Sequence, residues 1–274
     1  MAGGDGTTAG SWNFNQGGPH TADILGGQVL IGGHLNLLNN PGTATFTIGN
    51  DAGANPHVRI GGNLNYRAGG ADTFNLRSGT LELTGGDVHY MNRTGTNAFN
   101  WTGGTLEHVG TFHGDLIQGN TDSQSRLVIG ASPGVMTIPD TYDYTLDAAG
   151  AYKSVLQIEI FGDGTGGAGV DFDQLIVGGM ASFDASSDIA LVLQGYTPVL
   201  HDAWQIIDAG SIDVMGDVNM LFDTSAAPLS DLLIWDFGDF ANYGTVKVKL
   251  VPEPAALALL GLAAAALLLR RRRS

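Results

Sequence analysis

FNLRSGTLEL at residues 74–83 returns 25 positions later as FNWTGGTLEH at residues 99–108. In both copies a short apolar and polar alternation, typical of a strand, stands on each side of a glycine turn. A repeat of this length predicts one coil of a β-solenoid, in which each coil covers the apolar face of its neighbour. We therefore expect Phe74 and Phe99, and likewise Leu81 and Leu106, to lie in register.

The rest of the body has the same texture. Short apolar runs alternate with Gly, Asn, Asp and Thr, and no helical period persists over three turns before residue 255. Strands are predicted at Gln28–Ile31, His34–Leu38, Thr43–Ile48, His57–Ile60, Asn63–Tyr66, Leu81–Leu83, Asp87–Tyr90 and Thr105–His108. We expect apolar ladders and Asn or Thr ladders at their inward positions.

The predicted fold class is all-β. We expect a β-solenoid, specifically a right-handed parallel β-helix, with a β-sandwich-like body as the alternative, because sandwiches also use short strands and frequent turns. One short C-terminal transmembrane helix completes the prediction. The predicted domains are glycine-rich solenoid repeats at 1–125, a second all-β module at 126–250, and a sorting and transmembrane segment at 251–274.

The second module differs by having longer, more aliphatic strands. They are predicted at Val155–Phe161, Gln174–Val177, Ile189–Leu193, Trp204–Ile207 and Leu232–Phe237. Gly244–Leu250 alternates cleanly, and we expect it to be an edge strand whose lysines discourage further pairing. Short motifs such as SPG at residues 132–134 and WQIIDAG at residues 204–210 make this region similar to the end of autotransporter-like β-helix passengers. The resemblance implies a continued β-helix or a sandwich-like cap with a structural role.

The C-terminal tail has three parts. Val251, Pro252, Glu253 and Pro254 precede an apolar run from Ala255 to Leu269, and four arginines follow as Arg270, Arg271, Arg272 and Arg273. As a helix the run would reach roughly 22 Å, short of the roughly 30 Å hydrocarbon core, and snorkelling arginines would extend it. Because basic flanks stay on the cytoplasmic side, the tail predicts a cytoplasmic C-terminus and an external body.

These three parts resemble the PEP-CTERM sorting domain of Gram-negative and related bacteria. The resemblance implies transit through the inner membrane, processing near Pro252–Pro254 by an exosortase-type enzyme, and association with extracellular polysaccharide at the cell surface or in the matrix. Residues 1–6 show no basic start and no apolar signal-peptide core. Export then requires an N-terminus missing from this sequence or a start codon assigned too late, and a non-exported protein is the third alternative.

Composition limits the partners. The chain has 274 residues, 42 glycines and no cysteine, so neither disulfides nor thiol chemistry are available. Without the four tail arginines, the chain has 8 basic and 27 acidic side chains and a formal charge of −19. This charge argues against nucleic acid as a partner and favours solubility outside the cell.

The sequence predicts no catalytic residue and no cofactor. The glycine-rich loop at residues 164–169 leads into a strand, which rules out a dinucleotide site at a helix N-terminus. Asp163, Asp171 and Asp173 around this loop could hold one calcium ion, with solvated turn aspartates as the alternative. The seven histidines form no helical zinc pair, and a transition-metal site would require histidines brought together by the fold.

We predict a non-enzymatic, exported structural protein. The alternative is a carbohydrate-binding or carbohydrate-cleaving protein on the same scaffold. Cleavage would use Glu82 and Glu107, which occupy equivalent repeat positions and would lie about 5 Å apart on adjacent coils. Binding would use Tyr66, Tyr90 and Trp101 as stacking faces, provided that they are exposed.

Overall fold

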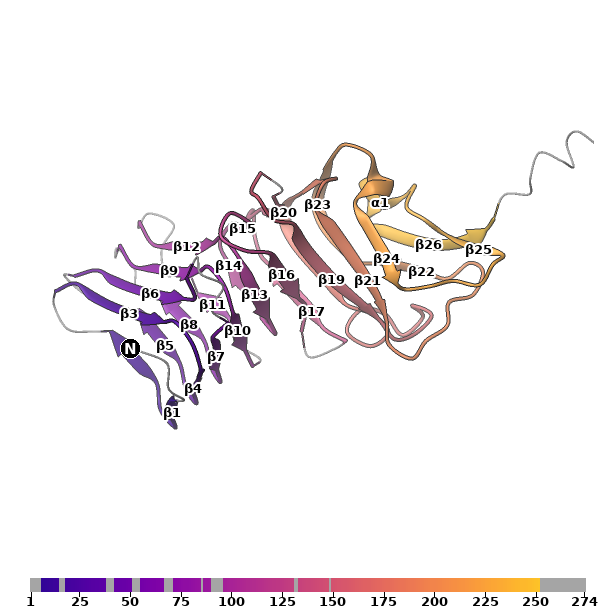
Figure 1. The fold of residues 1–274 in the computed structure, drawn as a ribbon. Helices are drawn as coiled ribbons and strands as arrows, with labels where there is room; N and C mark the ends of the chain where they lie inside the picture. The colour runs from indigo at the N-terminus through magenta and orange to yellow at the C-terminus, as the bar shows by residue number, and fades with distance from the viewer. Residues whose placement is uncertain are drawn as a thin grey trace, which may run out of the picture.

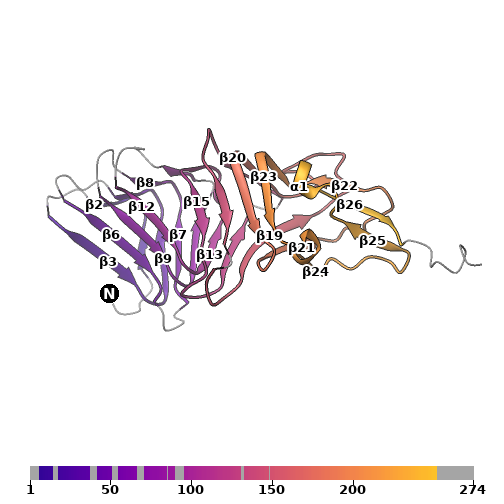
Figure 2. The ribbon, with the colours of Figure 1, turned by 90° about the horizontal axis from the view of Figure 1, so that it is seen from above.

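The computed structural model describes residues 6–14, 18–37, 42–50, 55–66, 71–84, 86–89, 96–130, 133–147 and 149–251. These residues are nearly all β and form an elongated body. Its strands stack side by side from the indigo N-terminal end to the yellow C-terminal end (Figure 1), and the same order is seen from above (Figure 2). The predicted all-β class is confirmed.

Sheet A is the longest sheet and runs along most of the body. Its nine strands are β1 (Gly6–Thr8), β4 (Gln28–Ile31), β7 (His57–Ile60), β10 (Thr80–Leu83), β13 (Gly104–Glu107), β16 (Ser125–Val128), β19 (Ser154–Ile160), β21 (Asp188–Leu193) and β24 (Phe222–Ala226).

Two shorter sheets accompany it in the first half. Sheet B contains β2 (Trp12–Phe14), β5 (Leu35–Leu37), β8 (Leu64–Tyr66), β11 (Val88–His89) and β14 (Phe112–His113). Sheet C contains β3 (His20–Ile24), β6 (Ala44–Ile48), β9 (Thr73–Leu76) and β12 (Ala98–Trp101).

Two further sheets complete the second half. Sheet D contains β15 (Leu116–Gln118), β17 (Val135–Ile138), β18 (Tyr144–Leu146), β20 (Gln174–Asp184) and β23 (Ile207–Met215). Sheet E contains β22 (Ala203–Gln205), β25 (Leu233–Asp236) and β26 (Thr245–Leu250). A 3₁₀ turn at Val218–Met220 and the one-turn helix α1 (Phe240–Tyr243) are the helical elements of the described chain.

The pairing in the first half follows a coil. Each strand pairs in parallel with the strand three elements later, so every turn of the chain adds one strand to each of sheets A, B and C. Parallel pairing needs a long return path, and here the strands of the other two sheets provide it. Among the named strands, antiparallel pairs occur only in sheet E.

The register predicted from the repeat is confirmed. Phe74 pairs with Phe99 between β9 and β12, and Leu81 pairs with Leu106 between β10 and β13. The predicted strands Gln28–Ile31 and His57–Ile60 agree residue for residue with β4 and β7. Most others differ by one residue at one or both ends. Trp204–Ile207 is divided between β22 and β23, and β20 extends well beyond the predicted Gln174–Val177.

The core consists of apolar ladders inside the coils. In sheet C the rings of Phe46, Phe74 and Phe99 stack on one another with centroids 5.3 Å apart at each step. Leu81 and Leu106 are fully buried in the corresponding ladder of sheet A. Burial of each such side chain contributes roughly 1.5–3 kcal/mol, and the ladder repeats this gain in every coil.

The amide ladders lie on the outer face rather than inside. Asn36 stands between the buried Leu35 and Leu37, so the alternation of the strand turns its side chain outward. Its Nδ2 donates to Oδ1 of Asn13 at 2.6 Å, and Asn65 donates in the same way to Asn36 at 2.6 Å. The expectation of inward asparagines was therefore wrong, because inward positions on these strands are apolar.

Sheet A continues across residue 126 through β13, β16 and β19, while sheets B and C give way to sheet D nearby. The division into modules at 1–125 and 126–250 stays a prediction.

β26 is paired on both sides, by β22 and β25, so the expectation of an edge strand was wrong. Its lysines instead form ion pairs, Lys247 with Asp239 and Lys249 with Asp236.

Candidate functional site

Glu82 is the centre of the first candidate site. It lies on β10, is only 8% exposed, and accepts contacts from three basic side chains. Nε2 of His57 is 3.1 Å from Oε2, Nε of Arg59 is 3.3 Å from Oε1, and Nδ1 of His108 is 3.3 Å from Oε1. The β7 residues come from the preceding coil, since Arg59 and Glu82 are Cα partners.

The two predicted glutamates are neighbours. Glu82 and Glu107 are Cα partners in the β10–β13 pair, and ligand atoms of His57, Glu82 and Glu107 all lie within 4.8 Å of one another. A cavity of about 220 Å³ opens beside His108. It is lined by Thr84, His108, Val109, Gly110, Gly130, Gly134 and Val135, so neither glutamate faces it. The carboxylates are close enough for glycoside chemistry, but they are not placed around that cavity.

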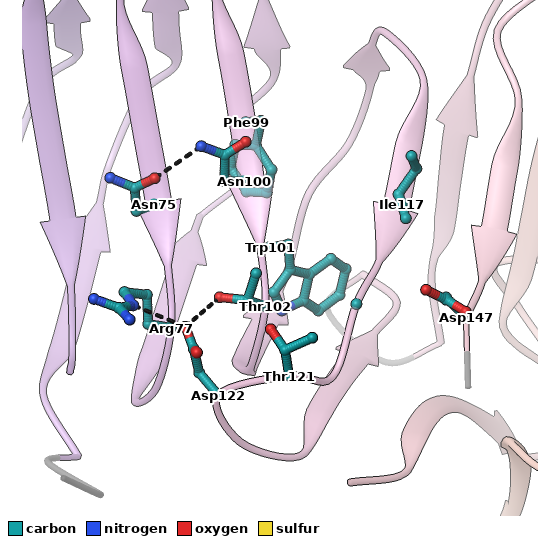
Figure 3. A pocket seen from close by; sticks show the side chains of 11 residues that line it. Asn75, Arg77, Phe99, Asn100, Trp101, Thr102, Ile117, Thr121, Asp122 and Asp147 are labelled. Atoms are coloured by element: carbon teal, nitrogen blue, oxygen red, sulfur yellow. Dashed lines mark hydrogen bonds and ion pairs between the residues drawn. The ribbon is translucent and has the colours of Figure 1, made fainter. Parts of the chain in front are cut away.

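A larger groove lies where sheet C ends at β12 and sheet D begins at β15 (Figure 3). It has a volume of about 520 Å³, and apolar, amide and charged side chains line it. The lining residues are Asn75, Arg77, Phe99, Asn100, Trp101, Thr102, Ile117, Gly119, Thr121, Asp122 and Asp147. Such a mixture of ring faces and hydrogen-bonding groups suits a polar organic ligand such as a sugar chain.

Charged groups fix one end of this groove. Oδ2 of Asp122 accepts hydrogen bonds from Nε of Arg77 and Oγ1 of Thr102, both at 2.7 Å. Burial raises the pKa of Asp122, but these two hydrogen bonds and the charge of Arg77 outweigh it and hold the pKa below its usual value. The carboxylate is therefore ionised and ordered at neutral pH.

The other end of the groove carries an amide ladder. Nδ2 of Asn100 donates to Oδ1 of Asn75 at 2.9 Å (Figure 3). Nδ2 of Asn75 in turn donates to Oγ1 of Thr47 at 3.2 Å. Asn100 is exposed and ends the ladder, because β12 is the last strand of sheet C. Its side-chain oxygen lies on the side away from Asn75 (Figure 3) and can act as an acceptor.

Two of the three proposed aromatic stacking faces are buried. Tyr66 is fully buried and Trp101 is 3% exposed, so both belong to the core by the criterion stated for them. Tyr90 lies outside the described residues. Phe99 was not among the predicted stacking residues, but its partly buried ring lines the groove.

The three aspartates of the predicted calcium site have separate partners. Oδ1 of Asp163 accepts from the N–H and the hydroxyl of Thr165, and Oδ2 of Asp171 accepts from Gly166 N–H at 2.7 Å. Asp173 is fully buried, and its two oxygens accept from backbone N–H groups. Calcium binding here stays a prediction.

Two groups in the described part of the chain bring metal-ligating atoms of three side chains within 4.8 Å of one another. One is the Glu82 group, and the other joins Asp87, His89 and His113. Sequence reasoning missed the convergence of these histidines. The signal was present in the coil period, since His89 and His113 are separated by about the same length as the repeat.

The described chain ends beside sheet E, where the N–H of Val251 donates to the carbonyl of Leu232 at 2.9 Å. The remaining predicted sites, Pro252 to Pro254, Ala255 to Leu269 and Arg270 to Arg273, lie outside the described residues. Within the described ranges, helices are too short or too polar to cross a membrane.

Comparison with known proteins concerns this tail. No curated protein sequence matches the chain. No family match covers the body, so the similarity of 126–250 to autotransporter-like passengers stays a prediction. Residues 250–273 match the family model of the PEP-CTERM protein-sorting motif, which includes the predicted motif, apolar run and arginines. This motif marks a protein that is exported and sorted by an exosortase to the cell surface or the exterior.

Proposed function

We propose that this protein is a non-enzymatic structural component of the cell surface or extracellular matrix, associated with exopolysaccharide. The observation that carries the proposal is the sorting motif at residues 250–273. We further infer that the body is a right-handed β-solenoid and that the apolar run at Ala255–Leu269 crosses the inner membrane before processing, with Arg270–Arg273 on the cytoplasmic side.

The body has the physical properties that such a role requires. Each parallel strand of the stacked coils is hydrogen-bonded to a strand of the adjacent coil, and strands held in this way are poor substrates for proteases. The chain lacks cysteine, so its stability does not depend on the redox state outside the cell. The formal charge of −19 on the chain without its four tail arginines favours solubility and repels other acidic surfaces.

The test is fractionation of the host, with mass spectrometry of the C-terminus, in cells with and without their exosortase. We expect a mature chain outside the cell that ends near Pro252–Pro254, and retention of the intact tail in the inner membrane without the enzyme. Glu253→Ala should block processing, whereas Asp231→Ala, which removes an exposed carboxylate of the body, should not. An intact Arg270–Ser274 tail on all surface copies would contradict the proposal.

A second candidate function is carbohydrate binding in the groove between β12 and β15. The favouring observation is the exposed end of the Asn75–Asn100 ladder beside Phe99 and the Arg77–Asp122 pair. Amide, guanidinium and carboxylate groups around an apolar floor are the donors and acceptors that hydroxyl-rich ligands use.

Two matched variants test binding to purified host exopolysaccharide. Asn100→Ala removes the end of the ladder in the groove, and Asn13→Ala removes the end of the similar ladder in sheet B. We expect only Asn100→Ala to weaken retention on the immobilised polymer. Equal retention of both variants would exclude the groove as the binding site for the polymer. A fall in the chain length of the polymer that Glu107→Gln abolishes would replace the non-enzymatic proposal with glycoside cleavage.

A further inference from the structure

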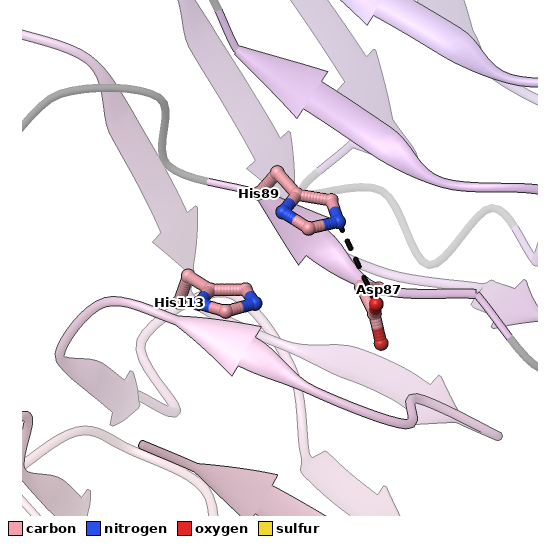
Figure 4. A group of neighbouring side chains, drawn as sticks. All are labelled: Asp87, His89 and His113. Carbon is pink, nitrogen blue, oxygen red and sulfur yellow. Dashed lines mark ion pairs between the residues drawn. The ribbon is translucent and has the colours of Figure 1, made fainter. Parts of the chain in front are cut away.

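Two histidines and an aspartate come together on the outer face of sheet B. His89 and His113 are Cα partners in the β11–β14 pair, and their rings stack with centroids 4.7 Å apart and planes 15° apart (Figure 4). Asp87 lies two residues before His89, with Oδ2 3.5 Å from His89 Nε2. One ligand atom from each of the three side chains lies within 4.8 Å of the others.

The fold holds the aspartate in place. The N–H of Asp87 donates to Oδ1 of Asn63 at 3.1 Å, and Oδ1 of Asp87 accepts from the N–H of Thr111 at 2.8 Å. These two bonds join three successive coils, and they leave Oδ2 turned toward the imidazoles (Figure 4). A carboxylate whose second oxygen is fixed by the backbone is a pre-oriented ligand.

The site is open to solvent and follows a column of amides. The side chains of His89 and Asp87 are 33% and 35% exposed, so an ion can reach them. The same outward column holds Asn13, Asn36 and Asn65 in the preceding coils, which are joined by hydrogen bonds. Two imidazoles cannot continue that chain of amide bonds, but a ring nitrogen that carries no proton offers a lone pair to a cation.

We propose that Asp87, His89 and His113 bind a divalent transition-metal ion of the zinc type. Two imidazoles and one carboxylate form the ligand set that such borderline ions prefer, and oxygen-seeking calcium and magnesium use few imidazoles. Three protein ligands leave the fourth position for water or for a donor from a second molecule. At the His57, Glu82 and Glu107 group, by contrast, the Arg59 guanidinium already lies 3.3 Å from the Glu82 carboxylate and supplies the positive charge.

Zinc titration of the full chain tests this proposal. The protein is purified in detergent without a histidine tag, and zinc affinity is measured by competition with a chromophoric chelator. We expect one ion per chain, with His89→Asn and His113→Asn each lowering affinity at least tenfold. Asparagine suits both positions because the preceding coils carry it in the same column. His57→Asn is the matched control, since it removes an imidazole from the other group, and it should leave the affinity unchanged.

Two results would overturn the proposal: unchanged affinity in both His89→Asn and His113→Asn, or loss of binding in His57→Asn alone. X-ray absorption at the zinc edge of the wild-type protein supplies a measurement that does not depend on the variants. Scattering from two imidazole rings is expected, and a shell of oxygen ligands alone would reject the site.

Discussion

Asn63 and Asp87, in successive coils, are joined by a hydrogen bond from the N–H of Asp87 to Oδ1 of Asn63 at 3.1 Å. The same bond recurs along sheet B at the residue or turn that precedes each strand. Ser11 accepts from His34 N–H, His34 from Asn63 N–H, and Asp87 from Thr111 N–H, at 2.8–2.9 Å. Each side chain thus satisfies the backbone of the next coil at a corner where no strand partner is available.

Removal of one member of this column should destabilise the fold. We expect Asn63→Ala to lower the free energy of unfolding by about 1–2 kcal/mol, because the partly buried N–H of Asp87 loses its acceptor. Asn63→Ser should cost less, since Ser11 shows that a hydroxyl can serve in the column. Urea denaturation compares the two, and equal losses would show that the hydrogen bond contributes nothing.

Truncation within the phenylalanine ladder should be among the most damaging changes. Phe74 is fully buried between Phe46 and Phe99, so Phe74→Ala is expected to cost about 3–5 kcal/mol through lost contacts and the cavity left behind. Val199→Ala, at a position 55% exposed, should change stability by less than about 0.5 kcal/mol. Thermal melting followed by circular dichroism measures both. A loss below about 1 kcal/mol for Phe74→Ala would contradict close packing of the ladder.

Substitution of two glycines distinguishes the cost of a left-handed backbone from the cost of a steric clash. Gly79 and Gly195 have φ of +79° and +73°, so alanine at either position costs about 1–2 kcal/mol for the left-handed conformation. A Cβ at Gly79 would also lie 2.2 Å from the carbonyl oxygen of Pro56 in the adjacent coil, whereas one at Gly195 would meet nothing within 4 Å. Gly79→Ala should therefore be clearly less stable than Gly195→Ala in urea denaturation. Similar losses would mean that the coils can separate locally at little cost.

Asp173 should make stability depend on pH. Burial raises its pKa to about 7, with the charge of Glu159 adding to the rise and hydrogen bonds from Glu159 N–H and Gly134 N–H opposing it. An unfolded aspartate titrates near pH 4, so between about pH 4 and about pH 7 the folded state holds a proton that the unfolded state has lost. This contribution to stability is complete below about pH 4 and is lost as the pH rises to about 7.

Asp173→Asn removes that titration. The variant should be less stable than wild type by about 1–3 kcal/mol at pH 4, because its amide presents N–H to a backbone N–H. Chemical denaturation should show that the difference in free energy of unfolding between the variant and wild type narrows as the pH rises from 4 to 7. Asp231→Asn changes an exposed position, so its free energy of unfolding should follow the same pH dependence as that of wild type. A constant gap for Asp173→Asn would show that the carboxylate stays ionised in the folded protein.

Several features of this protein could be predicted from local sequence. Alternation placed the strands, and the repeat at 74–83 and 99–108 predicted which residues pair, because stacked coils must bring equivalent positions together. The tail could be predicted for a different reason, because the PEP-CTERM motif is recognised from the linear order of its three segments.

The tertiary structure alone decided the sites. Asn36 and Asn65 are 29 residues apart, whereas His89 and His113 are 24 apart, yet both pairs lie directly side by side. The coils differ in length, and the extra residues lie in loops. The register between distant coils therefore depends on the hydrogen bonds of every intervening coil rather than on any local pattern. The groove beside β12 and the pairing of His89 with His113 both follow from that accumulated register. Local sequence therefore determined that coils form, and the closed geometry of the stacked coils determined which side chains meet.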